Sequence, residues 1–329
     1  MDFTPVKNSK GSLHFVAHPG GAPANVAAGI AKLGGKARYF GRLSSDPLGR
    51  LIARTLEETG VDTSQLPESS HKATALAVVS LNKHGNREFT FYHDGTADIC
   101  ISPEDVPSNL FDGVSICHFG SFALSVPQSA SVMKRIMKDA ENANCLISSD
   151  LNVRASLWKS GRKLSSSLRF LAGRSNVLKC SIEELGYLDQ QRSPTETAFR
   201  DRRKTRRRIE ELAQNIFDTG PELLVVTMGR GGAAILARDR RVFLGSFNIT
   251  PVDTTGAGDA FFSSMLYCLA SHGYDSRKRL RRMDEDDMRR FGIFSSAAAA
   301  LSCLHYGGME SFGTETEVNH FMKAHRMRA

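Results

Sequence analysis

Short apolar runs recur through the middle of this 329-residue chain, separated by longer stretches with helical periodicity. The runs are 114–119 (VSICHF), 145–151 (CLISSDL), 176–180 (NVLKC) and 223–227 (LLVVT). Runs of this length without polar alternation are typical of strands buried on both faces, and their alternation with helices is typical of βαβ units. We therefore predict an α/β fold with a mainly parallel sheet that helices cover on both sides.

Residues 73–92 have a different pattern, because two alternating strands, TALAVVSLN and REFTFY, flank a turn at Lys83–Asn86. This is a hairpin signal, and its one polar face does not suit a buried parallel sheet. We expect a small β lid with elements at about 1–18 and 72–98, in which 13–18 (LHFVAH) adds a strand. The lid belongs to one domain that spans 1–329. Brief strands follow at 233–237 and 241–247, and helical patterns lie at 260–270, 286–304 and 315–325.

The composition is that of an ordinary globular enzyme, with 41% hydrophobic and 24% charged residues. No apolar run approaches the roughly 20 residues of a membrane span, and the start MDFTPVKNSKGS has no signal-peptide core. We therefore expect a cytoplasmic protein with no membrane partner. The cysteines and histidines show no zinc-binding spacing.

The net charge of +8 comes largely from two basic runs, 200–208 (RDRRKTRRR) and 277–282 (RKRLRR). A nucleic-acid surface usually interleaves such charges with aromatic residues, and neither run does so. Each run also lies in a segment with helical periodicity. We therefore favour solvated helix faces over a nucleic-acid interface.

A glycine-rich segment, Asp253–Asp259 (DTTGAGD), comes directly before an amphipathic helix. Glycines let the backbone turn tightly there, and the free N–H groups and dipole of the first helical turn attract an anion. Asp259 at this helix start is suited to accept a proton from a hydroxyl while the amides hold a migrating phosphoryl group. Asp253 is suited to order a hydrated cation beside the phosphates. Taken alone, the segment also fits an Asp-capped helix after a glycine turn.

Two other glycine segments have the same ambiguity. In Pro19–Gly35 (PGGAPANVAAGIAKLGG) a glycine pair precedes a helix whose first turn contains Asn25, which is suited to bond a sugar hydroxyl. Thr227–Gly232 (TMGRGG) follows the strand 223–227, and its backbone is suited to pass under a nucleotide. Each segment alone also fits an ordinary turn.

In combination, these segments resemble a known family. GGAPANVAAGIAKLGG and DTTGAGDAF are similar, in order and separation, to the two signatures of the PfkB (ribokinase-like) carbohydrate kinases. Within this family the chain most resembles the fructokinases. The stretches that carry the likeness are 88–98 (EFTFYHDGTAD), 111–121 (FDGVSICHFGS), 149–158 (SDLNVRASLW) and 179–185 (KCSIEEL).

The resemblance implies a three-layer α/β/α ribokinase-like sheet domain with a β lid over the sugar, ATP and Mg²⁺ as cofactors, and a homodimer through the lid. It implies Asp259 as the catalytic base, with an anion hole at Gly256, Ala257 and Gly258. The implied sugar-binding residues are Asp2, Gly21, Asn25 and Arg154. The implied nucleotide-binding residues are Lys179, Thr227, Gly229, Gly232 and Ser296. Glu184 is expected to influence Mg²⁺ indirectly, and a monovalent cation such as K⁺ is expected near Asp253 and Thr255.

The chain also departs from the family pattern. Leu151 replaces a proline, Ser181 replaces the asparagine of the NxxE motif, and Ser296 replaces an adenine-side asparagine. Residues 307–310 (GGME) replace the commoner GAxP, and 191–208 is more basic than usual. We also expect the first core strand to be missing, since the chain starts at MDFTPV. Its loss would expose strand edges and apolar helix faces, at a cost of several kcal/mol at roughly 25 cal/mol per Å².

Three hypotheses follow. The first is a fructokinase that uses ATP to make fructose 6-phosphate. The second is a kinase for another sugar, such as 2-keto-3-deoxygluconate or ribose. The third is a non-catalytic scaffold or regulatory protein whose basic segments bind nucleic acid, which a missing strand favours. The intact DTTGAGD segment opposes the third hypothesis, because a scaffold has no chemical need for Asp259.

Overall fold

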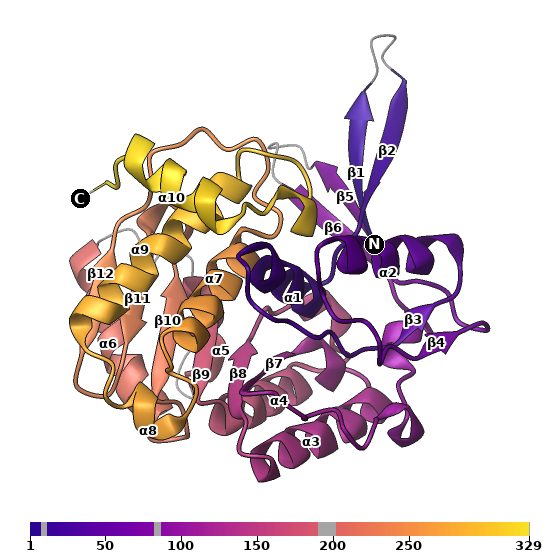
Figure 1. The fold of residues 1–329 in the computed structure, drawn as a ribbon, viewed down its shortest axis with the longest axis horizontal. Coiled ribbons are helices and arrows are strands. Elements are labelled where there is room, and N and C mark those ends of the chain that lie inside the picture. Colours follow the sequence, from indigo (N-terminus) through magenta and orange to yellow (C-terminus); the bar gives the residue numbers. More distant parts are fainter. Residues whose placement is uncertain (8–11, 82–86, 190–201, 329) are drawn as a thin grey trace. The chain divides into compact units, whose positions relative to one another are not determined.

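The computed structural model describes residues 1–7, 12–81, 87–189 and 202–328 (Figure 1). The chain divides into two compact units. We call the first the lid unit; it consists of Met1–Pro107, Ile249–Ser263 and Ala298–Val318. The second, which we call the sheet unit, consists of Ser108–Asn248, Ser264–Ala297 and Asn319–Ala329.

The sheet unit is built around a six-stranded sheet with the order β12-β11-β10-β9-β8-β7. The four apolar runs of the sequence form its parallel strands: β7 (Ile116–Gly120), β8 (Leu146–Asp150), β9 (Val177–Ser181) and β10 (Leu223–Thr227). Two antiparallel strands, β11 (Ala233–Leu236) and β12 (Arg241–Leu244), complete it. The sheet is therefore mixed.

One face of this sheet packs against four helices. They are α3 (Pro127–Asn142), α4 (Gly161–Arg174), α5 (Ile182–Leu188) and α6 (Arg202–Phe217). Alternate strand residues such as Ile147, Leu178 and Leu224 point into this core. These residues are apolar at every second position because a strand presents successive side chains to opposite faces.

The basic run on α6 lies on the exposed side of that helix, while Thr205 and Ile209 are buried. Its positive charges have partners within the protein: the Arg206 guanidinium lies 5.0 Å from the centre of the Phe243 ring, and Arg207 Nε donates to Glu211 at 2.9 Å. The part of the basic segment at 191–201 lies outside the described residues.

The opposite face of the sheet is approached by α9 (Glu285–Ser302). A Cβ atom on Gly292 would lie 2.4 Å from side-chain atoms of both Ile235 and Leu244, so the α9 backbone comes close to the sheet there. The remaining helices are α7 (Ala257–Ser271), α8 (Arg277–Leu280) and α10 (Glu315–Ala324). Short 3-10 turns lie at Ala97–Ile99, Pro103–Asp105, Phe122–Leu124, Ala155–Leu157, Gly229–Gly231 and Met309–Ser311.

The lid unit contains a four-stranded sheet with the order β2-β1-β5-β6 (Figure 1). Its strands are β1 (Asp2–Lys7), β2 (Leu13–His18), β5 (Leu76–Leu81) and β6 (Arg87–Tyr92). The turn predicted at Lys83–Asn86 lies largely outside the described residues. β1 pairs with β2 along its whole length, but with β5 only at Asp2 and Phe3. The shorter pairing stops before Pro5, which has no N–H to donate.

Two helices and a minor sheet complete the lid unit. α1 (Ala22–Lys32) and α2 (Pro47–Glu58) pack around a core that includes Ala28, Leu56 and Met309. β3 (Leu43–Ser44) pairs with β4 (Glu68–Ser69). Asp46 caps α2 by accepting the Gly49 N–H at 2.8 Å. Among the described helices, none has the length and apolar character needed to cross a membrane.

Candidate active site

Within the lid unit, α1 and the first half of α7 approach each other very closely at Gly29. A Cβ atom on Gly29 would lie 2.3 Å from Ser263 Oγ and 2.7 Å from Ser263 Cβ, distances that no real Cβ tolerates. Asn25 and Asp259 each lie four residues, about one helical turn, before these contact residues. The close approach at Gly29 and Ser263 therefore brings the Asn25 and Asp259 side chains together.

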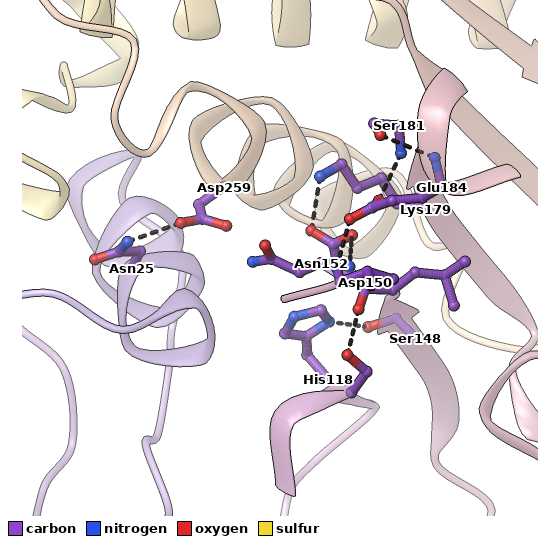
Figure 2. A network of polar contacts seen from close by, with 12 residues as sticks. Asn25, His118, Ser148, Asp150, Asn152, Lys179, Ser181, Glu184 and Asp259 are labelled. Carbon is purple, nitrogen blue, oxygen red and sulfur yellow. Dashed lines mark hydrogen bonds and ion pairs between the residues drawn. The ribbon is translucent and has the colours of Figure 1, made fainter. Parts of the chain in front are cut away.

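Asn25 Nδ2 donates a hydrogen bond of 2.7 Å to Asp259 Oδ2 (Figure 2). Both residues are buried, with 4% and 7% of their surface exposed. Because an ionised carboxylate only accepts hydrogen bonds, this contact fixes which end of the Asn25 amide is the nitrogen. Asn25 Oδ1 is then buried with no hydrogen-bond partner in the described part of the chain. A buried acceptor without a donor costs free energy, so this atom points to a ligand that supplies a hydroxyl or N–H group.

A glycine turn at Gly307 and Gly308 backs this pair. A Cβ atom on Gly308 would lie 3.2 Å from Asn25 Oδ1, and one on Gly256 would lie 3.2 Å from Gly308 Cα. Gly256 and Gly307 have φ angles of 74° and 96°, in the left-handed region that favours glycine. Backbone conformation therefore favours glycine at 307, and tight packing on Asn25 favours it at 308.

Asp253 ties the turn to the start of α7. Its Oδ1 accepts the Thr255 N–H at 2.7 Å, and its Oδ2 accepts the Gly307 N–H at 3.3 Å. Asp253 is 2% exposed, and both of its oxygens are already bonded to backbone amides. Its role in this structure is to fix the loop, and the monovalent-cation site near Asp253 and Thr255 stays a prediction.

The predicted anion hole lies at the N-terminus of α7, which begins at Ala257. The Ala257 N–H donates to the Thr254 carbonyl at 3.3 Å. Within the described ranges, the N–H groups of Gly256 and Gly258 have no backbone acceptor. These two amides, together with the positive end of the helix dipole, are the part of the segment best able to bind an anion.

Asp2 lies beside the glycines that precede α1. A Cβ atom on Gly20 would lie 2.6 Å from Asp2 Oδ2, so only glycine lets this carboxylate come so close to the backbone. Gly21, with a φ of 126°, is the next residue and the N-cap of α1. The lid unit thus brings together three of the predicted sugar-binding residues, Asp2, Gly21 and Asn25, with Asp259.

In the sheet unit, polar side chains line up at the carboxyl ends of the parallel strands. Residues directly opposite each other on neighbouring strands share a face of the sheet. By this register one face presents His118, Ser148, Asp150, Lys179, Ser181 and Thr227. The carboxyl ends of parallel strands are where α/β sheets bind ligands.

A buried ion pair dominates this polar row. Lys179 Nζ donates to Asp150 Oδ2 at 2.7 Å, and their side chains are 7% and 1% exposed (Figure 2). Beside it, His118 Nδ1 lies 3.1 Å from Ser148 Oγ. Burial, and then the positive charge of Lys179, lower the pKa of His118 to about 3. His118 is therefore neutral, and Lys179 is the buried positive charge of this row.

Glu184 forms a capping box with Ser181 at the start of α5. Its Oε2 accepts the Ser181 N–H at 2.8 Å, and its Oε1 accepts the Val153 N–H at 2.5 Å. Burial, and then the nearby charge of Asp150, raise its pKa. Within the described ranges, no three His, Cys, Asp or Glu side chains are grouped as a metal cluster.

The segment Thr227–Gly232 forms a tight loop after β10. The Met228 N–H donates to the Gly232 carbonyl at 2.8 Å, and the Gly232 N–H donates to the Gly229 carbonyl at 3.0 Å. A Cβ atom on Gly232 would lie 2.0 Å from the Leu244 carbonyl oxygen. Gly232 is thus required by packing, whatever else the loop binds.

Comparisons with known proteins identify the family. The pattern of the pfkB family of carbohydrate kinases matches residues 2–315. The chain is 32% identical to a probable fructokinase-4 of Arabidopsis thaliana over 94% of this chain and 89% of that protein. This chain belongs to the pfkB family of carbohydrate kinases.

Solved structures of fructokinases share the fold of this pfkB kinase. The fructokinase of Xylella fastidiosa, solved with bound ATP, superposes with a TM-score of 0.85 at 30% identity, over 98% of this chain and 95% of that one. The fructokinase of Vibrio cholerae O395, solved with fructose, ADP and calcium ion, has a TM-score of 0.81 at 29% identity over the same shares. The predicted ribokinase-like fold, with a central sheet, flanking helices and a small separate sheet, is confirmed. The sheet is mixed, as the two antiparallel strands show.

The remaining predicted residues of this pfkB kinase lie in the sheet unit. Arg154 is exposed, and its Nη1 donates to the carbonyl of Val153 at 3.2 Å. Ser296 is half-buried on α9. Asp150 was not among the predicted site residues, although it lies in the stretch 149–158 that carries part of the likeness to fructokinases. Its pairing with Lys179 follows from the strand register, which the sequence alone does not specify.

We predict that Gly29→Ala will lower kcat by forcing α1 and α7 apart at Ser263, which separates Asn25 from Asp259. Displacements near 1 Å cost about 10²-fold in rate. The double variant Gly29→Ala/Ser263→Gly adds a methyl group on α1 and removes the hydroxymethyl group of Ser263 from α7, and we expect most of the activity to return. Steady-state kinetics would measure both effects. A double variant no more active than Gly29→Ala would contradict this account.

We also predict strong coupling between Lys179 and Asp150. Removing one partner of a buried ion pair costs about 3–5 kcal/mol because the other charge is left unpaired. Lys179→Met and Asp150→Asn should each lower the free energy of unfolding in urea, and the double variant should lose much less than their sum. The matched control is the exposed pair Arg207–Glu211, for which coupling below about 1 kcal/mol is expected. Additive losses at Lys179 and Asp150 would refute the coupling.

Proposed function

We propose that this protein is an ATP-dependent fructokinase, which converts D-fructose and ATP to fructose 6-phosphate and ADP. The observation that carries the proposal is the unsatisfied Asn25 Oδ1, which lies buried beside the Asp259 carboxylate. Two sugar hydroxyls satisfy these groups, since one donates to Asn25 Oδ1 and the other, the reacting hydroxyl, loses its proton to Asp259. The named relatives support the choice of sugar, because the Vibrio cholerae enzyme was solved with fructose and ADP.

In the proposed reaction Asp259 acts as the general base. It takes the proton of the C6 hydroxyl while that oxygen bonds to the γ-phosphorus of ATP in line with the bond that breaks. ADP leaves with the electrons of the broken phosphorus–oxygen bond, and the N–H groups of Gly256 and Gly258 stabilise charge on the transferred phosphoryl oxygens. The Asn25 hydrogen bond holds the Asp259 carboxylate in one orientation. Asp2 and Gly21 are proposed to contact the other end of the sugar, with Arg154 as a further contact.

The nucleotide is proposed to bind through Lys179 and the loop after β10, with Thr227, Gly229, Gly232 and Ser296 as its other contacts. Lys179 is suited to this role because its charge is kept on a buried side chain by Asp150. Mg²⁺ would be held mainly by the phosphates and neutralise their charge. Glu184, whose oxygens are bonded to backbone amides, would influence that ion indirectly. K⁺ near Asp253 and Thr255 is proposed as well, and potassium ion is present in a variant of the Vibrio cholerae enzyme.

The substrate test is a panel of sugars assayed with ATP, with ADP release and the phosphosugar both measured. We expect the highest kcat/KM with fructose. Faster turnover of ribose or 2-keto-3-deoxygluconate would identify that sugar as the substrate in place of fructose, and the proposed kinase activity would still hold. The absence of ATP-dependent turnover with every sugar would refute the proposed function.

Asp259→Asn is predicted to lower kcat by about 10²–10⁴-fold, the usual contribution of a general base. The Asn carbonyl can still accept the Asn25 amide hydrogen, so folding should be preserved and the melting temperature should change little. Steady-state kinetics and thermal unfolding would measure the two effects. The matched control is Asp112→Asn at an exposed position, which should leave kcat unchanged. A fall in kcat of less than tenfold would rule out Asp259 as the base.

We further propose a homodimer through the lid sheet. Most of the exposed large apolar residues of the described chain lie on it: Val6, Leu13, Phe15, Val16, Phe89 and Tyr92. By strand register Leu13, Phe15 and Tyr92 share the face opposite to that of Asp2. Val6, Val16 and Phe89 lie on the other face of the same sheet. Exposed apolar groups gathered on one element in this way are typical of an interaction surface.

Phe15→Glu is predicted to shift the protein towards monomer, because it buries a charge in the proposed interface. Sedimentation velocity over a range of concentrations would measure the shift. Leu51→Glu is the matched control, since Leu51 is also exposed but belongs to α2 and not to the lid sheet. A wild-type chain that stays monomeric at all concentrations would contradict the proposed dimer.

A further inference from the structure

His18 and Glu310 form a contact that none of the predicted sugar or nucleotide contacts includes. His18 is the last residue of β2, and Glu310 follows the Gly307–Gly308 turn. His18 Nδ1 lies 2.8 Å from Glu310 Oε2, and the His18 side chain is only 13% exposed. Because an ionised Glu310 can only accept, Nδ1 must carry the proton.

This pair closes over the glycine turn. A Cβ atom on Gly307 would lie 3.0 Å from His18 Nδ1 and 3.1 Å from Glu310 Oε2. Lys32 holds the same segment from α1, because its Nζ donates to the carbonyls of Glu310 at 3.0 Å and Phe312 at 2.9 Å. The turn therefore has the His18–Glu310 pair on one side.

The other side of the turn faces the reacting residues. Gly308 packs on the Asn25 amide, and the Gly307 N–H donates to Asp253. His18 also lies directly opposite Asp2 in the β1–β2 pair, so the two side chains share a face of the lid sheet. One imidazole thus links the end of a lid strand to the backbone that supports Asn25.

We propose that His18 and Glu310 are positioning residues for the sugar. Their bond clamps the Gly307–Gly308 turn, and the turn in turn holds Asn25 Oδ1 where a sugar hydroxyl reaches it. This inference rests on the proposed sugar kinase activity and adds residues to it. A clamp at the sugar end affects sugar binding, whereas ATP binding has no contact with these residues in the proposal.

The test is a set of matched variants assayed for kcat and for the KM of both substrates. His18→Ala and Glu310→Ala should each raise the sugar KM about tenfold, the effect of losing one charge-assisted hydrogen bond at a partly exposed site. A rise in KM with kcat unchanged reports lost ground-state binding. Because the clamp affects binding of the sugar alone, the ATP KM should stay within about twofold. The sugar KM of the double variant should be no higher than that of either single variant, because the same interaction is lost in all three.

Two conservative variants distinguish a clamp from a direct contact between the imidazole ring and the sugar. His18→Asn places an amide nitrogen near the position of Nδ1 but has nothing at Nε2, so it should restore the sugar KM. Glu310→Gln keeps an acceptor and should do the same. His14→Ala is the control, since His14 lies on the same strand and face but opposite Val6, away from the turn.

Three results would overturn the clamp: an unchanged sugar KM in His18→Ala, an equal rise in the KM of ATP, or a His18→Asn variant no better than His18→Ala. If the wild-type chain phosphorylates no sugar, the proposed function fails by itself. The clamp is then tested by ¹⁵N NMR, which shows which ring nitrogen of His18 carries the proton. In the wild-type chain the proton should lie on Nδ1, and in Glu310→Ala it should no longer favour Nδ1. A spectrum that Glu310→Ala leaves unchanged would overturn the clamp without any sugar.

Discussion

The contact between α1 and α7 at Gly29 and Ser263 is the constraint on which the candidate active site depends. Helices normally pack with their axes 8–10 Å apart, and the smallest separations need a residue without a side chain. Gly29 provides it, and the consequence appears one turn earlier, where Asn25 reaches Asp259. The site is therefore set by packing between two elements that are far apart in sequence, and its polar bond is a result of that packing.

The glycine turn at Gly307 and Gly308 adds a second constraint of the same kind. It brings backbone, with no side chain, against Asn25, and its N–H satisfies Asp253. Buried polar groups are normally paired within a protein, and here Asp253 and Asp259 follow that rule. Asn25 Oδ1 has no hydrogen-bond partner among the described residues, although Gly308 of the same turn packs against it. An acceptor left open in a site that otherwise satisfies its polar groups is what ligand recognition requires.

The sequence predicted the secondary elements well where local physics decides them. The four apolar runs became parallel strands, and the glycine segments begin α1 and α7, because burial and helix-start chemistry act within a few residues. β1 was not predicted as a strand, since Pro5 interrupts it and it is stabilised by pairing with β2 and β5, which lie elsewhere in the sequence. Local patterns also identified Asn25 and Asp259 as separate candidates, but their contact depends on helix packing. The same limit applies to Asp150, which becomes a partner of Lys179 only through strand register.

The buried pair of Lys179 and Asp150 is better explained by a role in ligand binding than by a contribution to the stability of the fold. An apolar pair of similar volume is often as stable as a buried ion pair or more so, because removing two charges from water is expensive. The chain does use ion pairs at its surface, where Arg277 and Arg281 both bond Glu222 and are themselves more than half exposed. At the carboxyl ends of the strands the pair instead keeps a lysine charged beside His118, which is neutral because its pKa is about 3. A charge maintained at that cost, in the part of an α/β sheet where ligands bind, is consistent with a lysine that meets an anionic ligand.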